Sequence, residues 1–203
     1  MKSRQIGLYF GSFNPVHIGH MAIANYMVTA GGMDEVWFVV SPRSPFKEKS
    51  SLLPDYHRLE MVHLAIGEDP RMRASNIEFG MPQPNYTSRT LVTLKEKYPQ
   101  HRFHLMMGSD NLAGFHKWHQ YEFILAEFQL LVYPRPGAPA GDLQHHPSVH
   151  IVQAPHMDIS ASFVREHVQA GQDMRHFLPP RVWAYLEDNQ LLRKVKPTRK
   201  SEK

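Results

Sequence analysis

The stretch Phe10-Gly11-Ser12-Phe13-Asn14-Pro15-Val16-His17-Ile18-Gly19-His20 lies between two segments with different hydrophobic periodicity. The apolar run 5–10 before it predicts a buried strand, and residues 19–30 after it carry apolar side chains at helical spacing. The stretch is therefore predicted to be a tight turn that opens a helix. Such a turn favours an anion, because unpaired backbone N–H groups and the helix dipole both point at the ligand.

Strand and helix patterns alternate along the rest of the chain. Strands are predicted at 5–10, 35–41, 72–79, 102–107, 128–133 and 149–153. Helices are predicted at 19–30, 54–67, 87–98, 160–170 and 179–189. Helical connections between successive strands imply right-handed crossovers, so we expect a Rossmann-like, doubly wound α/β fold. Its mostly parallel sheet would carry helices on both faces.

In such a fold, ligands bind beyond the carboxyl ends of the strands. The turns that would lie at this edge are 11–20, 42–47, 108–118 and 158–165. The sequence shows no internal repeat and no linker, so we predict one domain over residues 1–192 and a basic tail over 193–203. The proline- and glycine-rich stretch 134–147 is predicted to be a surface excursion within that domain.

Composition narrows the class of protein. The chain has 203 residues, a formal net charge of +4 and no cysteine. Disulfides, thiolate nucleophiles and cysteine-ligated zinc are thereby excluded, and a reducing compartment is indicated. No apolar stretch reaches the length of a membrane span, and residues 1–4 lead into a strand without the core of a signal peptide. We therefore expect a cytoplasmic protein with no membrane partner.

Much of the positive charge lies in the tail, 193–203, which contains no aromatic residue. The simplest interpretation is a solvated terminal segment. Nucleic-acid binding is the alternative, and a modest basic excess equally suits an enzyme of anionic metabolites. We expect no nucleic-acid partner.

His17 and His20 place two imidazoles three positions apart at the predicted helix start. They have three interpretations. The first is helix capping with one packed histidine, and the second is a metal site, for which no cysteine or third ligand is present in the motif. The third is hydrogen-bond donation to phosphate oxygens that gain charge during transfer.

A second cluster, Asp158-Ile159-Ser160-Ala161-Ser162-Phe163-Val164-Arg165, follows the last predicted strand and opens another helix. Serines at a helix start commonly serve only as caps. Arg165 lies one turn into that helix, and a guanidinium that reaches back to its N-terminus would complete a second anion site.

Two further loops carry weaker signals. The basic loop 41–50 is interpreted either as an ordinary solvated loop or as a flap that brings Lys47 over a phosphate. Gly108-Ser109-Asp110-Asn111 and Trp118 form either a plain turn with a core aromatic residue or a nucleotide contact. In the second case a carboxylate would meet a ribose hydroxyl and an indole would face a planar ring.

Taken together, these segments resemble the nicotinate-nucleotide adenylyltransferases. That family belongs to the nucleotidyltransferases marked by Gly-x-Phe-(Asp/Asn)-Pro-x-His-x-Gly-His, a signature that residues 11–20 match throughout. Residues 159–165 are similar to the family's Ile-Ser-Ser-Thr-x-Ile-Arg motif, with Ala161 in place of the second serine and Ser162 in place of the threonine. Pro45-Phe46-Lys47 keeps the lysine of the family's Pro-Pro-His-Lys loop but not the histidine.

Shorter matches follow in the family's order along nearly the whole chain. They are Arg58-Leu59-Glu60-Met61, Tyr86-Thr87-x-x-Thr90-Leu91, Gly108-Ser109-Asp110-Asn111-Leu112, Lys117-Trp118 and Leu178-Pro179-x-x-Val182-x-x-Tyr185-Leu186.

The resemblance implies that the protein joins ATP and nicotinate mononucleotide into nicotinate adenine dinucleotide and pyrophosphate, in NAD biosynthesis. It implies catalytic roles for His17, His20, Lys47 and Arg165. It implies ATP binding by Gly11, Ser12, Phe13, His17, His20, Gly108, Asp110, Ser160, Ser162 and Arg165. It implies acceptor binding by Thr87 and Trp118. Mg²⁺ is expected to arrive with ATP, and no metal site made of protein side chains alone is expected.

Two alternatives to this function remain open in the sequence. One is the same adenylyl transfer to another acceptor, nicotinamide mononucleotide or phosphopantetheine. The other is a non-catalytic ATP-binding module, towards which only Ala161 points.

Overall fold

The computed structural model describes residues 3–42 and 52–192. Lys47 and the predicted tail 193–203 lie outside these residues, so the role of Lys47 and the boundary of the domain at residue 192 stay predictions. In the described part of the chain, no helix combines the length and the apolar character needed to cross a bilayer.

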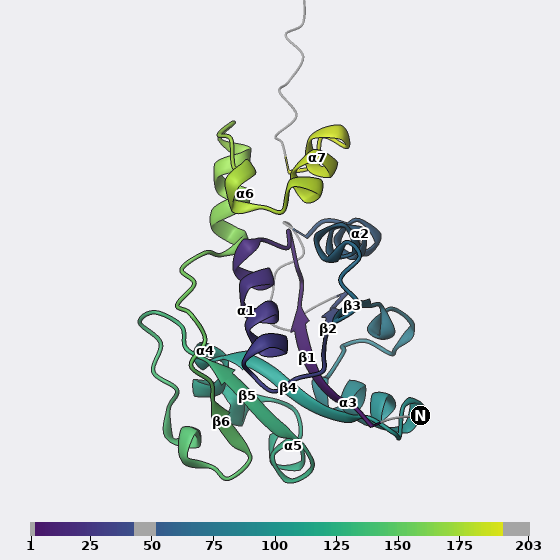
Figure 1. Ribbon diagram of the computed structural model, residues 1–203, viewed down its shortest axis with the longest axis vertical. Helices are drawn as coiled ribbons and strands as arrows, with labels where there is room; N and C mark the ends of the chain where they lie inside the picture. The colour runs from purple at the N-terminus through teal and green to yellow at the C-terminus, as the bar shows by residue number, and fades with distance from the viewer. Residues whose placement is uncertain (1–2, 43–51, 193–203) are drawn as a thin grey trace, which may run out of the picture.

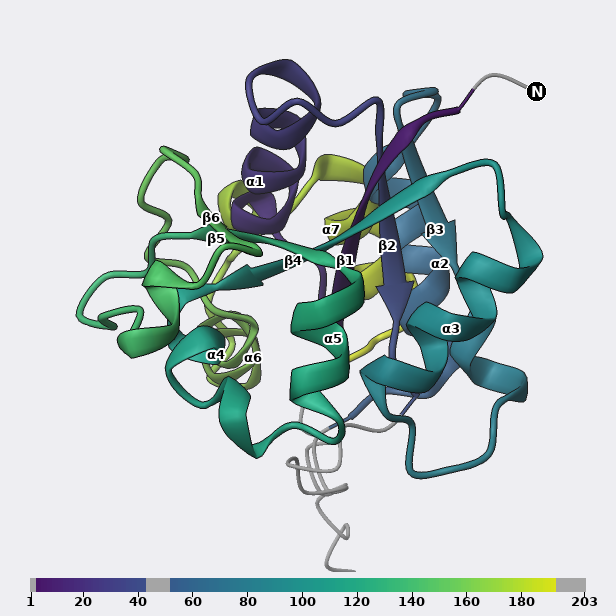
Figure 2. The ribbon, with the colours of Figure 1, turned by 90° about the horizontal axis from the view of Figure 1, so that it is seen from below.

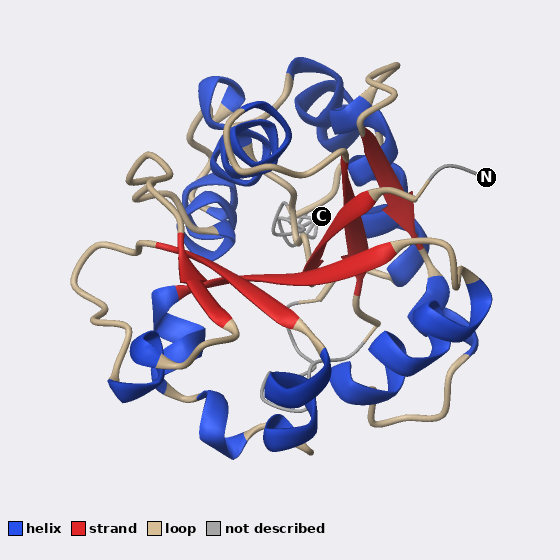
Figure 3. Cartoon of the chain, turned by 60° about the horizontal axis from the view of Figure 1, so that its bottom comes forward, coloured by secondary structure: helices blue, strands red, loops and turns tan. Residues whose placement is uncertain are grey.

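A parallel sheet forms the middle layer of the molecule (Figures 1 and 3). Its strands are β1 (Gln5–Gly11), β2 (Glu35–Val40), β3 (Met72–Ser75), β4 (Arg102–Gly108), β5 (Gln129–Tyr133) and β6 (Val149–Ile151). Within the described residues the order is β3-β2-β1-β4-β5-β6, and every neighbouring pair is parallel. From β1 to β3, successive strands are added towards one edge of the sheet, and from β4 to β6 they are added towards the other edge. The topological switch point therefore lies between β1 and β4, beside the turn that follows β1. The predicted fold class is confirmed.

Helices cover both faces of this sheet. They are α1 (Ile18–Thr29), α2 (Asp55–Ile66), α3 (Thr87–Lys97), α4 (Ser109–Ala113), α5 (Tyr121–Glu127), α6 (Ala161–Gln169) and α7 (Pro180–Asp188). Short 3-10 turns occupy Ile77–Gly80, Phe115–Lys117, Asp142–His145 and Arg175–Phe177. Figure 2 shows α1 on one side of the sheet and α3 and α5 on the other.

The two faces bury separate apolar cores. Along β1, Ile6 and Leu8 enter the core shared with α3, α4 and α5, whereas Tyr9 enters the core shared with α1, α2, α6 and α7. Adjacent residues of a strand point to opposite faces, and a parallel sheet buried on both faces therefore has continuous apolar strands. This is why the runs 5–10 and 35–41 could be recognised in the sequence.

Some element boundaries differ from the sequence prediction. The strand predicted at 72–79 ends at Ser75, and Ile77–Gly80 is a 3-10 turn. The turn directs the Glu78 side chain into the protein, where its carboxylate accepts a hydrogen bond of 2.7 Å from the Thr90 hydroxyl. The helices α4 and α5 were not predicted. With five and seven residues they are too short to show a helical period.

Candidate active site at the carboxyl edge of the sheet

The turn after β1 is built on a close contact between Gly11 and Phe13. Phe13 has a φ of 45° and is buried, and its ring lies so close to Gly11 that a Cβ on Gly11 would stand 2.9 Å from it. A side chain at position 11 would therefore push the Phe13 ring away. Glycine is needed here for close packing, and Phe13 accepts a left-handed backbone conformation that non-glycine residues seldom adopt.

His17 and His20 lie against each other at the start of α1. Their ring centroids are 3.7 Å apart, and the His17 backbone N–H donates a hydrogen bond of 3.2 Å to His20 Nδ1. Because Nδ1 of His20 accepts, the proton of the neutral ring lies on Nε2. Gly19 makes the arrangement possible, since a Cβ at that position would stand 3.0 Å from His17 Nδ1. The capping interpretation of His20 is thus correct for its Nδ1 atom.

His17 is held in its neutral form. Its side chain is 3% exposed, and its pKa falls from 6.5 to about 4, first because of burial and second because of the positive charge of Arg135. The Nδ1 atom is buried without a hydrogen-bond partner among the described residues. A neutral imidazole at this place can donate a hydrogen bond, but it contributes no net charge above about pH 5.

The depressed pKa of His17 predicts a loss of stability in acid. Between pH 6.5 and 4 the unfolded chain binds a proton at this histidine that the folded chain does not, so the free energy of unfolding falls as the pH decreases. The contribution of this one group between pH 7.5 and 4.5 is about 2.5 kcal/mol. Chemical denaturation at both pH values should show that His17→Asn loses less stability than the wild type. The exposed His176→Asn serves as the control, and an identical pH dependence of His17→Asn and wild type would contradict the assignment.

The start of α6 lies against the same turn. Ser160 caps this helix, its Oγ accepting from the Phe163 N–H at 3.1 Å, as the simpler interpretation held. Arg165 reaches further: its guanidinium donates to the Asn14 carbonyl at 2.9 Å and to Ser162 Oγ at 3.0 Å. The two motifs, separated by about 150 residues in the sequence, therefore meet through Arg165.

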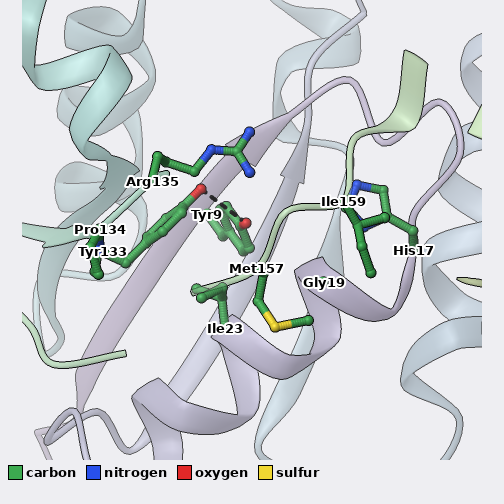
Figure 4. A pocket seen from close by; sticks show the side chains of 9 residues that line it. All are labelled: Tyr9, His17, Gly19, Ile23, Tyr133, Pro134, Arg135, Met157 and Ile159. Carbon is green, nitrogen blue, oxygen red and sulfur yellow. Dashed lines mark hydrogen bonds between the residues drawn. The ribbon is translucent and has the colours of Figure 1, made fainter. Parts of the chain in front are cut away.

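The segment before α6 closes over the first turn of α1. Ile159 Cβ lies 3.7 Å from the position that a Cβ on Gly19 would take, and Met157 and Ile159 line a narrow pocket together with His17 (Figure 4). The remaining lining residues are Tyr9, Gly19, Ile23, Tyr133, Pro134 and Arg135.

Arg135 is a residue of this pocket that the sequence analysis did not select. It follows the carboxyl end of β5, and Figure 4 shows its guanidinium extending into the pocket past Tyr133. Its Nε lies 3.7 Å from Asp110 Oδ1. The signal that identifies it is its position, because a basic residue directly after a parallel strand lies at the ligand-binding edge.

The turn 108–110 holds Arg135 in place. Ser109 Oγ donates to the Ala138 carbonyl at 2.7 Å and accepts from the Arg135 N–H at 2.9 Å. Gly108 has no side chain to collide with Asp110 and Arg135, which pass close above it. The start of the stretch 134–147, predicted to be a loose surface excursion, is therefore tied to the site at Arg135 and Ala138.

The two predicted acceptor residues lie in segments that contact each other. Thr87 is the first residue of α3, and Trp118 is half-buried and packs on Phe115 with ring centroids 5.1 Å apart. Their neighbours join them: Tyr86 stacks on His119 at 4.3 Å. Neither Thr87 nor Trp118 is among the residues that line the pocket of His17.

The described residues hold no group of three or more His, Asp or Glu side chains able to bind a metal ion. The site instead offers hydrogen-bond donors and guanidinium groups, which suit phosphate oxygens.

A parallel sheet with a Gly-x-Phe-Asn-Pro-x-His-x-Gly-His turn at its switch point defines a nucleotidyltransferase, and the cytidylyltransferase-like family model matches residues 8–167. A protein of Flavobacterium johnsoniae named "Probable nicotinate-nucleotide adenylyltransferase" is 46% identical over 94% of this chain and 100% of its own length. One of Bacteroides fragilis with the same name is 47% identical over 90% of this chain and 91% of its own length. The chain belongs to the nicotinate-nucleotide adenylyltransferase family.

Solved structures share the fold. The Plasmodium falciparum nicotinic acid mononucleotide adenylyltransferase complexed with NaAD superposes with a TM-score of 0.79 and 20% sequence identity, covering 93% of this chain and 97% of that one. The same enzyme complexed with APC gives a TM-score of 0.77.

Proposed function

We propose that this protein transfers the adenylyl group of ATP to nicotinate mononucleotide, giving nicotinate adenine dinucleotide and pyrophosphate, a step of NAD biosynthesis. The observation that carries the proposal is the contact of Arg165 with the His17–His20 turn, because it joins both phosphate motifs in one site. Relatives with that activity in their names, at 46% and 47% identity over nearly the whole chain, support the choice of nucleotide and acceptor.

The reaction requires no covalent participation of the protein. The phosphate of nicotinate mononucleotide is already an anionic nucleophile, so neither a general base nor a covalent intermediate is needed. The protein has to align two anions and stabilise charge on the α-phosphate and on the leaving pyrophosphate.

The residues of the site divide these tasks. His20 donates from Nε2 and His17 from its neutral ring to oxygens of the α- and β-phosphates, and the backbone of residues 11–13 supports them. Arg165, Ser160 and Ser162 hold the β- and γ-phosphates at the start of α6, with Lys47 over the leaving group. Because His17 is neutral, the positive charge comes from the guanidinium groups, Lys47 and the Mg²⁺ that enters with ATP.

On the acceptor side, Thr87 presents the N-terminal backbone N–H groups of α3, and Trp118 offers an aromatic face. A nicotinate carboxylate is an anion that such N–H groups stabilise, whereas the nicotinamide amide carries its own donors. Discrimination between the two acceptors is therefore by charge more than by size.

Pyrophosphate release with ATP and Mg²⁺ tests the proposal, with nicotinate mononucleotide, nicotinamide mononucleotide and phosphopantetheine offered in parallel. We expect selective turnover of the nicotinate compound. If another acceptor were turned over instead, the assignment of the phosphate site would stand, but the acceptor roles of Thr87 and Trp118 would be refuted. ATP binding without turnover of any acceptor would establish a non-catalytic module.

Trp118→Ala is expected to raise the KM for nicotinate mononucleotide about tenfold with little change in the KM for ATP, because stacking on an aromatic face contributes roughly 1–3 kcal/mol per base. Trp183→Ala, which removes a half-buried indole from α7, is the matched control. An unchanged acceptor KM in folded Trp118→Ala would show that the indole does not face the pyridine ring.

A further inference from the structure

Arg58 of α2 is a buried charged side chain with an unusual set of partners. It is 0% exposed, and its guanidinium donates to the carbonyls of Ser12 at 2.6 Å, Ser41 at 2.8 Å and Pro42 at 3.1 Å. Its Nε donates to the Leu53 carbonyl at 3.0 Å, and Asp55 accepts at 2.5 Å. Four backbone carbonyls from three separate segments thus converge on one side chain.

These segments all belong to the carboxyl edge of the sheet. Ser12 lies in the turn after β1, Ser41 and Pro42 follow β2, and Leu53 precedes α2. The ends of β1 and β2 are already joined by the Ser41 N–H, which donates to the Gly11 carbonyl at 2.9 Å. Arg58 extends that junction into the phosphate-binding turn.

The bond to Ser12 has a directional consequence. In a trans peptide unit the C=O and the following N–H point in opposite directions. Because the Ser12 carbonyl points at Arg58, the N–H of Phe13 points away from Arg58. Phe13, with its φ of 45°, keeps a backbone conformation that surrounding contacts must maintain.

Stability by itself does not account for an arginine at this place. Burying a charged group is expensive, and well-packed apolar residues of similar volume often serve a core as well or better. A guanidinium does what an apolar side chain cannot, since it holds several carbonyls at defined angles at once. Direct contact with a substrate is also excluded, because the side chain has no exposed surface.

We propose that Arg58 is a positioning residue, which orients the Ser12–Phe13 peptide so that the Phe13 N–H is presented to a phosphate of the nucleotide. The expected effect of Arg58 on kcat rests on the proposed adenylyl transfer. The expected effect of Arg58 on the contact between ATP and the Phe13 N–H can be measured with ATP and Mg²⁺ alone, so the two proposals can fail separately.

The kinetic test compares Arg58→Met and Arg58→Lys with Arg71→Met, which makes the same change at an exposed arginine paired with Asp69. All are assayed at saturating ATP and nicotinate mononucleotide, per mole of protein shown to be folded by circular dichroism. Arg58→Met is expected to lower kcat by about tenfold or more, because a small misplacement of catalytic groups is costly. Arg58→Lys should recover part of the loss. A kcat of folded Arg58→Met within twofold of wild type would overturn the proposal.

A spectroscopic test covers the case in which Arg58→Met does not fold. In ¹⁵N-labelled wild type, ATP with Mg²⁺ is expected to shift the amide resonance of Phe13, and in Arg58→Lys that shift should shrink at full ATP occupancy. A purely structural role would leave it unchanged. An unperturbed Phe13 amide in the wild type, or the same perturbation in Arg58→Lys, would refute the role of Arg58 whether or not the protein turns over.

Discussion

His20→Ala and His17→Ala are each expected to lower kcat by about 10²–10³-fold at saturating ATP and Mg²⁺, corresponding to roughly 2.7–4 kcal/mol of lost transition-state stabilisation. The reason is geometric. His20 Nδ1 accepts from the His17 N–H, so the proton of the neutral His20 ring lies on Nε2, and the close pair of rings stands at the opening of α1. Such donors act on charge that develops only during transfer, so the effect falls on kcat.

The two variants differ in stability. His20 is partly exposed, so His20→Ala should fold like the wild type, whereas His17→Ala empties a buried position and should also lower the unfolding temperature. His145→Ala, at an exposed position, is the control for the loss of an imidazole as such. Steady-state pyrophosphate release measures all three. Near-normal turnover of His20→Ala would remove His20 from the mechanism, and near-normal turnover of folded His17→Ala would do the same for His17.

Arg165→Met is expected to lower kcat/KM for ATP by about 10–150-fold, because hydrogen bonds to charged groups contribute about 1.5–3 kcal/mol. The substitution keeps most of the aliphatic stem and removes the guanidinium that donates to Asn14 and Ser162. The positive charge proposed to bind the nucleotide phosphates and the hydrogen bond that links the two motifs are lost together.

Arg165→Lys separates these contributions. It keeps the positive charge but cannot donate to two acceptors in a planar fork, so an intermediate loss is expected. The exposed Arg181→Met on α7 is the matched control. If Arg165→Met kept the wild-type KM and kcat, the start of α6 would have no part in binding ATP.

The fold could be predicted because each strand carries its own signal. Buried parallel strands are apolar throughout, and the longer helices show a regular period, so local pattern was sufficient for β1, β2, α2 and α3. The short helix α4 and the turn at Ile77–Gly80 have no such signal. They form because tertiary contacts stabilise them; for the turn, one such contact is the buried hydrogen bond between Thr90 and Glu78.

The candidate site divides in the same way. His17, His20, Ser160, Ser162 and Arg165 could be selected from their spacing within two short motifs. Arg135 lies outside both motifs and was not selected. Its position after β5 was a signal in the sequence, but its contacts with Ser109 and Asp110, more than 20 positions earlier in the chain, appear only in the folded protein. Arg58 stood within a segment that resembles the family, but the sequence analysis assigned it no role.

By itself, the sequence determined the α/β class, the turn that opens α1 and the chemistry of its donors, since these depend on residues adjacent in the chain. The tertiary structure alone decided that Arg165 reaches Asn14, that Arg135 lowers the pKa of His17, and that Arg58 holds the Ser12 carbonyl. Each of these is a contact between segments that only the packing of the sheet and its helices brings within hydrogen-bond or electrostatic range. Sequence periodicity describes one segment at a time. Charged side chains and the backbone carbonyls of other segments come within range of each other only after the chain has folded.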